Sequence, residues 1–241
     1  EELETNMIEF TTAFAKKFNK EPTVKWMDVV NETILPNGKW FGPKKGTNKW
    51  ENPWLKIGLD DNGCPLYILK AFEIATKYAT NIKLVYNHNA GMESFMWDKV
   101  KETILYIRSK GYRVDGIGWQ AHIGLSASNK AILENTDEEL RELSGLIDWA
   151  HKNNLEFHIT ELDYFVKDNN KLSEEYQKQA EIYAKIVNIL REKIKSGVVT
   201  LNFWDMAVRT KKGKEGAFHS IYDSDFKPTP AYKAINLLSK N

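Results

Sequence analysis

Hydrophobic periodicity along this chain alternates regularly between helical and strand-like patterns, and this alternation is the strongest constraint on its fold. A helix is predicted over residues 1–19, before the first strand. Five strands are predicted after it, at residues 24–31, 82–87, 114–122, 155–162 and 198–205. The helices that follow them are predicted at residues 65–79, 95–110, 137–153, 173–195 and 230–239. Such alternation is typical of a parallel sheet with right-handed crossovers.

Two α/β folds are built in this way, the doubly wound sheet and the barrel. A dinucleotide-binding sheet carries a glycine-rich turn directly after a strand, whereas Gly116 and Gly118 lie within a predicted strand. Polar side chains gather instead at the carboxyl ends of the predicted strands, where a TIM barrel keeps its active site. These residues are Asn31, Glu32, Asn87, His88, Gln120, His122, Glu161, Asp163, Trp204 and Asp205. The sequence therefore predicts an α/β protein with the TIM (β/α)8 fold.

The chain is predicted to be a single catalytic domain over residues 1–241, because no linker or composition break divides it. Only five strands are predicted, and the helix at residues 1–19 precedes the first of them. We therefore expect the chain to supply the last five strand–helix units of a barrel, with the N-terminal units absent. An open sheet would expose apolar edges at residues 24–30 and 198–204. A separate N-terminal segment of the same barrel is accordingly an expected partner.

Composition excludes several classes of partner. The net charge of +1 gives no electrostatic reason to expect binding to nucleic acid or to an anionic membrane surface. A single cysteine, Cys64, rules out an internal disulfide and a cysteine-based zinc site. Tryptophan is abundant, with 8 residues, and Trp40 and Trp50 lie in a loop rich in Asn, Gly, Pro and Lys. Either ring could stack on a sugar, and packing within the loop is the equally good alternative.

Two glutamates end buried strands and require an explanation. Glu32 follows the run DVVN and Glu161 follows FHIT, and an ionised carboxylate is costly to desolvate without partners. A salt bridge at the barrel rim would explain either glutamate alone. Two carboxylates flanking one bond are the minimal apparatus of glycoside hydrolysis. A Mg²⁺ or Zn²⁺ site would bring a denser cluster of ligands.

Four segments resemble the sequence motifs of family-ten glycoside hydrolases, the endo-β-1,4-xylanases. The segment WMDVVNE at residues 26–32 is similar to that family's W-D-V-V-N-E, and ITELD at 159–163 to its I-T-E-L-D. GIGWQAH at residues 116–122 is similar to its G-I-G-x-Q-x-H strand. DSDFKPTPAY at 223–232 resembles its closing D-x-x-x-x-P-K-P-A-Y segment, with Thr229 in place of the lysine. The four segments occur in the family's order.

The resemblance implies a retaining endo-β-1,4-xylanase that needs no cofactor and no metal. Glu32 would be the general acid/base and Glu161 the nucleophile, with their carboxyl groups about 5–5.5 Å apart. Asn31 would bind the sugar 2-hydroxyl. The other implied substrate-site residues are Asn87, Gln120 in contact with Glu32, His122 in contact with Glu161, Asp163 orienting His122, Trp204 as an aromatic wall, and Trp40. The resemblance also implies that the enzyme is secreted, periplasmic or on the cell surface.

The chain also departs from the family's pattern. The strand that usually ends in N-D-Y-N reads NHNA at residues 87–90, and the loop that usually carries a second Trp followed by Arg reads MAVRTKKGKEGAFH at 206–219. Two alternatives to a xylanase stay open. One is a related barrel hydrolase acting on β-glucan, and the other is a non-catalytic glycan-binding fragment. A hydrolysis assay on xylan and carboxymethylcellulose separates the three.

Overall fold

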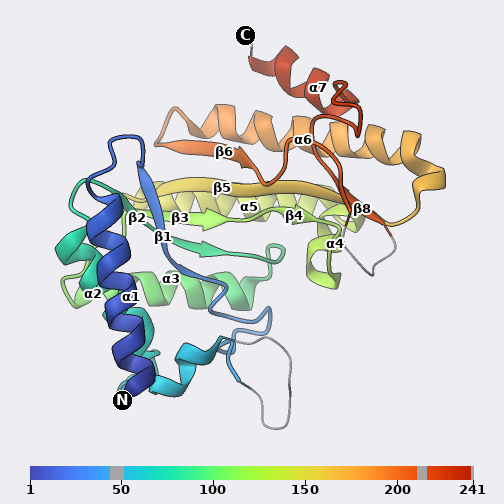
Figure 1. The fold of residues 1–241 in the computed structure, drawn as a ribbon. Coiled ribbons are helices and arrows are strands. Elements are labelled where there is room, and N and C mark those ends of the chain that lie inside the picture. The colour runs from blue at the N-terminus through green and yellow to red at the C-terminus, as the bar shows by residue number, and fades with distance from the viewer. Residues whose placement is uncertain (44–51, 211–215, 240–241) are drawn as a thin grey trace. The chain divides into compact units, whose positions relative to one another are not determined.

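A computed structural model describes residues 1–43, 52–210 and 216–239 (Figure 1). The α-helices are α1 (Glu2–Phe18), α2 (Leu66–Tyr78), α3 (Ser94–Ser109), α4 (Ala127–Glu134), α5 (Thr136–Lys152), α6 (Leu172–Lys193) and α7 (Pro230–Ser239), and the 3-10 helices are η1 (Pro53–Ile57) and η2 (Asn169–Lys171). The strands are β1 (Trp26–Asn31), β2 (Lys83–His88), β3 (Gly116–Trp119), β4 (His122–Ile123), β5 (Glu156–Val166), β6 (Val199–Phe203), β7 (Arg209–Thr210) and β8 (Ala217–His219). In the described residues no helix is long and apolar enough to cross a membrane.

The chain forms two compact units, each with its own packed interior. The N-terminal unit consists of residues 1–88 and 93–118, and the C-terminal unit of residues 89–92 and 119–241. Both units are built from strands that alternate with helices. Glu32 belongs to the first unit and Glu161 to the second.

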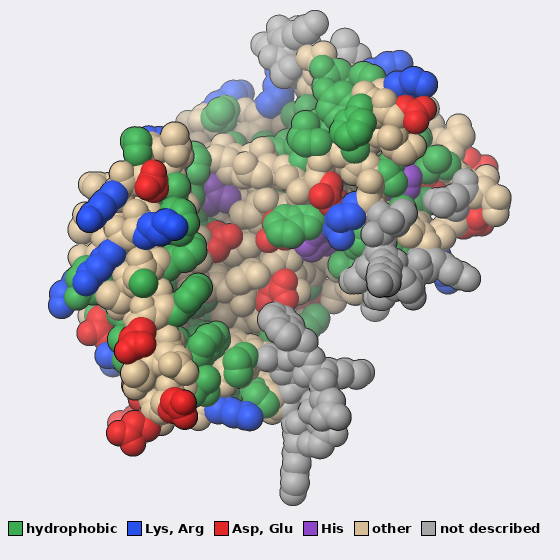
Figure 2. Space-filling view, viewed as in Figure 1, with side chains coloured by type: hydrophobic (Ala, Val, Ile, Leu, Met, Phe, Trp, Pro, Cys, Tyr) green, Lys and Arg blue, Asp and Glu red, His purple; other side chains and the backbone are tan. Residues whose placement is uncertain are grey.

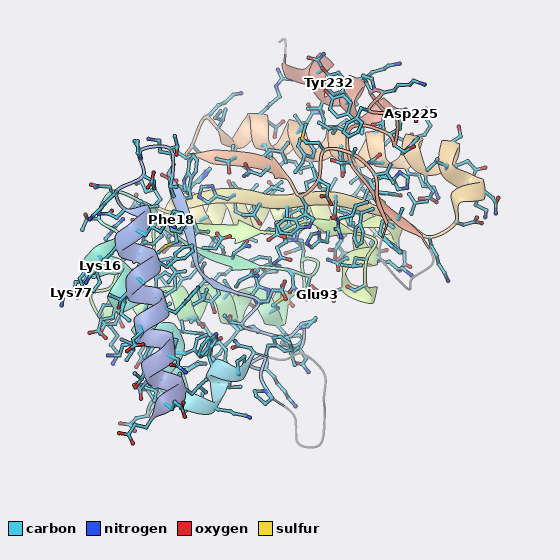
Figure 3. All side chains as sticks on the ribbon, viewed as in Figure 1. Lys16, Phe18, Lys77, Glu93, Asp225 and Tyr232 are labelled. Carbon is cyan, nitrogen blue, oxygen red and sulfur yellow. The ribbon has the colours of Figure 1, made fainter. Side chains whose placement is uncertain are left out.

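In the N-terminal unit, β1 and β2 pair in parallel, with Asn31 opposite Asn87 at their carboxyl ends. Helix α2 buries an apolar face that includes Ile68 and Phe72, whose spacing places them on one side of the helix. Helix α1 packs against α2. The ammonium groups of Lys16 (α1) and Lys77 (α2) lie 4.5 Å and 5.1 Å from the ring centroid of Tyr78, and Figure 3 labels both lysines.

In the C-terminal unit, β5 is the central strand. It pairs in parallel with β4 and with β6, and antiparallel with β8. Strand β8 also pairs antiparallel with β7, which forms a small hairpin beside β5. The antiparallel hairpin is an addition to the parallel sheet that the sequence predicted.

The closing segment at residues 223–232 anchors helix α7. Ala231 is fully buried, and the Tyr232 ring lies 5.2 Å from the Tyr222 ring. Tyr232 and Asp225 are labelled in Figure 3, and hydrophobic side chains gather on the surface over α7 in Figure 2. Helix α7 packs on α6, so this motif closes the unit through packing.

The predicted elements agree with the structure to within about two residues at most ends, and the last helix is confirmed over residues 230–239. Three predictions were wrong. The strand expected at 155–162 continues to Val166, so Glu161 lies within β5 and not at its end. The strand expected at 114–122 stops at Trp119, because Ala121 has a left-handed φ of 62°, and pairing resumes at His122. No helix was expected between that strand and residue 137, yet α4 occupies this stretch, with the Ser126 hydroxyl accepting the Asn129 N–H.

Candidate active site

Glu32 is the first residue after β1, and its backbone is in the left-handed region, with φ 53°. A non-glycine residue in this conformation costs about 1–3 kcal/mol and persists only where the surrounding structure imposes it. Such strain clusters at functional sites. The backbone outlier therefore supports, independently of any motif, a functional role for the Glu32 side chain.

Two hydrogen bonds hold the turn after Glu32 against the end of β2. The Glu32 N–H donates to the Asn87 carbonyl at 3.3 Å, and the Ile34 N–H donates to Nε2 of His88 at 3.0 Å. Because Nε2 accepts this bond, it carries no proton. His88 and Asn87 are both fully buried. His88 thus shapes the turn that presents Glu32.

A pocket of about 360 Å³ opens beside Glu32 within the N-terminal unit. Asn31 and Glu32 line it together with four aromatic side chains, Phe10, Phe41, Trp54 and Tyr67. Polar groups set in a mainly apolar wall are typical of small-molecule sites. The predicted substrate residue Asn31 is therefore beside the predicted acid, whereas Trp40 is not among the residues of this pocket.

Glu161 lies on β5 at a β-bulge. Ile159 pairs with Leu201 and Leu162 with Phe203, so β5 has one extra residue in this interval. Bulges re-aim side chains and are common next to active sites. The side chain of Glu161 is 13% exposed, which leaves its carboxylate reachable from solvent.

His122 links Glu161 to Asp163. Its Nε2 lies 3.2 Å from Oε2 of Glu161, and its Nδ1 lies 2.8 Å from Oδ1 of Asp163. Both acceptors are carboxylates, so both ring nitrogens donate only if the imidazole is protonated. Burial lowers the pKa of His122, but the hydrogen bonds to Asp163 and Glu161 outweigh it and raise the pKa to about 9. A cation is thereby held beside Glu161 at neutral pH.

Asp163 is fully buried, and burial raises its pKa, although His122 and Arg209 act in the opposite direction. The Arg209 Nη2 atom lies 3.5 Å from Oδ2 of Asp163, and the Arg209 Nε–H donates to Asp205. The Arg209 guanidinium also lies 4.3 Å from the centroid of the Phe218 ring. This residue therefore anchors the carboxylate that orients His122.

Sequence reasoning missed Arg209. A signal was present, because the corresponding loop of the resembling family carries a Trp followed by Arg, and here Val208-Arg209 retains the arginine. The β7–β8 hairpin positions Arg209 opposite Phe218. No hairpin was expected there, so the arginine had no predicted partner.

Trp204 follows β6 and is 53% exposed. Its ring meets the His122 ring edge-on, with centroids 6.2 Å apart and an interplanar angle of 89°. The exposed indole is therefore fixed beside the histidine that contacts Glu161. This position fits the aromatic wall expected from the sequence.

The remaining expected residues are placed as follows. Gln120 is buried, and its carbonyl accepts the Glu161 N–H at 3.1 Å. Its expected contact with Glu32 would join the two units and stays a prediction. Trp40 lies in a separate pocket against α3, and Trp50 lies outside the described residues.

The histidine bridge predicts that the stability of the fold depends on pH. Because the folded pKa of about 9 exceeds the ordinary 6.5, the stabilisation from His122 is complete below pH 6.5 and is lost as the pH rises through 9. It amounts to roughly 3 kcal/mol at most. An NMR titration of the His122 ring should show a pKa near 9 in the native chain and a lower one in Asp163→Asn. A native pKa near 6.5 would contradict the bridged arrangement.

Comparison with known proteins places the chain in a family. The model of glycosyl hydrolase family 10 matches residues 1–237. The endo-1,4-beta-xylanase A of Thermoanaerobacterium saccharolyticum is 27% identical over 97% of this chain and 18% of its own length. The exoglucanase XynX of Acetivibrio thermocellus is 28% identical over 97% of this chain and 19% of its own length. This chain therefore spans less than a fifth of both relatives.

Solved structures confirm the barrel fold. Native xylanase 10B of Thermotoga maritima superposes with a TM-score of 0.75 at 24% identity, over 97% of this chain and 65% of that one. Xylanase 10B of Thermotoga petrophila RKU-1, solved with xylobiose, superposes with a TM-score of 0.74 at 26% identity, over 97% and 64%.

The family match covers almost the whole chain and includes Glu32, Glu161, the histidine bridge and the closing segment. The chain belongs to glycosyl hydrolase family 10.

Proposed function

We propose that the protein is a retaining endo-β-1,4-xylanase that works as a single catalytic domain, with Glu161 as nucleophile and Glu32 as general acid/base. The observation that carries the proposal is the His122 bridge, which holds a protonated imidazole 3.2 Å from Glu161. The ring fixes the position of a Glu161 oxygen, and a carboxylate held in place is what a nucleophile at a sugar carbon requires.

In the first step, a Glu161 oxygen attacks C1 of the sugar, and the bond from C1 to the glycosidic oxygen breaks. Glu32 donates its proton to that departing oxygen. The product is a covalent glycosyl ester of Glu161 together with the released half of the chain. His122, fixed by Asp163, keeps the attacking carboxylate oriented throughout this step.

In the second step, Glu32 now acts as a base and takes a proton from water. The water oxygen attacks C1, and the ester bond to Glu161 breaks. Each step inverts the configuration at C1, so the product has the configuration of the substrate. Asn31, beside Glu32, is suited to bind the 2-hydroxyl, and Trp204 is suited to flank the sugar bound at Glu161.

The choice of xylan rests on the relatives. A relative named as an endo-1,4-beta-xylanase and a neighbour solved with xylobiose both favour this polymer. Another relative is named as an exoglucanase, so β-glucan is the second candidate substrate. Incubation with xylan and with carboxymethylcellulose should release reducing ends faster from xylan.

Proton NMR during the first minutes of xylo-oligosaccharide cleavage tests the mechanism. We expect the β-anomer to appear first and to mutarotate later. Initial appearance of the α-anomer would identify an inverting enzyme and overturn the role of Glu161 as nucleophile.

We further propose a secreted, periplasmic or cell-surface location, because polymeric xylan is outside the cell. One structural neighbour is described as an intracellular xylanase. Fractionation of the source cells followed by an activity assay decides between the two locations.

A further inference from the structure

We propose that the N-terminal unit carries a second, non-catalytic glycan site, centred on Trp40, that takes one pyranose ring of a xylan chain. The proposal rests on xylan as the substrate class. Its starting point is a pocket of about 190 Å³ against α3. It shares no lining residue with the pocket beside Glu32, although Trp40 and Phe41 are neighbours in the sequence.

Trp40 is held rigidly by its polar edge. Its Nε1–H donates to the Gly63 carbonyl at 2.9 Å. Gly63 lies in a tight turn in which Asp60 Oδ1 accepts the N–H groups of Asn62 and Cys64 at 3.0 Å and 2.9 Å. Since the indole N–H is already satisfied, the ring contributes mainly its flat apolar face to the pocket.

A polar rim surrounds this ring. The Asn62 amide donates to the Tyr106 hydroxyl at 2.7 Å, and that hydroxyl donates to Asp60 at 2.6 Å. Lys99 lies 5.3 Å from the centroid of the Trp40 ring and 3.6 Å from Glu102. Amide, ammonium and carboxylate groups together supply donors and acceptors, which matches sugar hydroxyls because each of these both donates and accepts.

The size and chemistry of the pocket favour one sugar ring. A volume of 190 Å³ equals about six water molecules at ~30 Å³ each, which suits a single pyranose ring of a longer chain. A pyranose of β-1,4-xylan offers a face of C–H groups to an indole ring and equatorial hydroxyls to a polar rim. The pocket combines an aromatic face with such a rim, as glycan contacts require.

Binding to the polymer tests the site independently of cleavage. Native gel electrophoresis through soluble xylan would be run with Glu161→Gln, so that the gel is not digested. In this background, Trp40→Ala should weaken retardation by xylan roughly tenfold. Asn62→Ala, at an exposed position, should weaken it in the same direction. Trp26→Ala removes a 43% exposed tryptophan from β1 and serves as the matched control, with retardation unchanged.

The outcomes separate this site from the proposed function. If Trp40→Ala folds and its retardation is unchanged, the site is overturned. If Trp40→Ala does not fold, unchanged retardation of Asn62→Ala overturns it. Neither result depends on whether the native protein cleaves xylan. Weaker retardation of Trp40→Ala and of Asn62→Ala, with Trp26→Ala unaffected, supports the site. Release of reducing ends by the native protein tests the proposed function separately, so either proposal can fail alone.

Discussion

Glu161→Ala should lower xylan turnover by roughly 10⁴-fold or more while leaving the fold intact. The residue lies at a bulge in β5, and its side chain contacts His122. Removing the carboxylate removes the atom that bonds to C1, so the double displacement cannot begin. Initial rates on xylan, with circular dichroism to verify folding, provide the measurement.

Adding azide to Glu161→Ala tests the nucleophile role directly. A small anion that enters the space of the missing carboxylate should attack C1 from the same face and restore cleavage of an activated aryl xyloside. The product would be the α-xylosyl azide, formed by one inversion. The matched control is Glu156→Ala, a glutamate at the first position of the same strand, which should keep xylan turnover. Normal turnover in folded Glu161→Ala would remove this residue from the mechanism.

The repeating elements of the fold could be predicted because their signals are local. Helix α7 begins at Pro230, a residue favoured in the first turn of a helix, and ends as expected. Strands β1 and β2 are short apolar runs bounded by polar residues. The α/β barrel class followed from the alternation of these elements, and the superposed xylanase structures confirm it.

The contact of His122 with Glu161 and Asp163 was predicted, but part of the reasoning behind it was wrong. The strand was expected to continue through Gln120 to His122, yet it ends at Trp119 and Ala121 turns with a φ of 62°. The contact therefore depends on irregular backbone at both residues. His122 follows the left-handed Ala121, and Glu161 lies at the bulge in β5. Hydrophobic periodicity in the sequence predicts neither irregularity.

Arg209 and Trp40 show why the rest of the site was not predictable. Arg209 reaches Asp163 through an antiparallel hairpin whose strands are only two and three residues long, too short for a periodic signal. Trp40 is directed by a hydrogen bond to Gly63, 23 positions away. A loop tryptophan can be recognised from composition, but the pocket that it lines depends on such long-range partners.

Glu32→Ala should lower kcat/KM by different amounts on different substrates, according to their leaving groups. On xylan, whose departing oxygen needs a proton, kcat/KM should fall by about 10²–10⁴-fold, the usual contribution of general acid catalysis. On a dinitrophenyl xyloside, whose leaving group departs as an anion, kcat/KM should change little. The second step still lacks its base, so the glycosyl-enzyme should accumulate and the dinitrophenolate should appear as a burst. Stopped-flow absorbance measures the burst, and intact mass spectrometry detects the added sugar on Glu161.

The backbone makes Glu32→Ala a clean substitution. Glu32 has a φ of 53°, and alanine in the left-handed region carries a similar penalty, so the change removes the carboxyl group without relaxing the turn. Glu32→Gly would relax that strain and should therefore stabilise the fold while being equally inactive on xylan. Equal losses of kcat/KM on xylan and on the dinitrophenyl substrate in Glu32→Ala would show that Glu32 does not donate the proton. In that case the strained turn would have to serve a purpose other than acid catalysis.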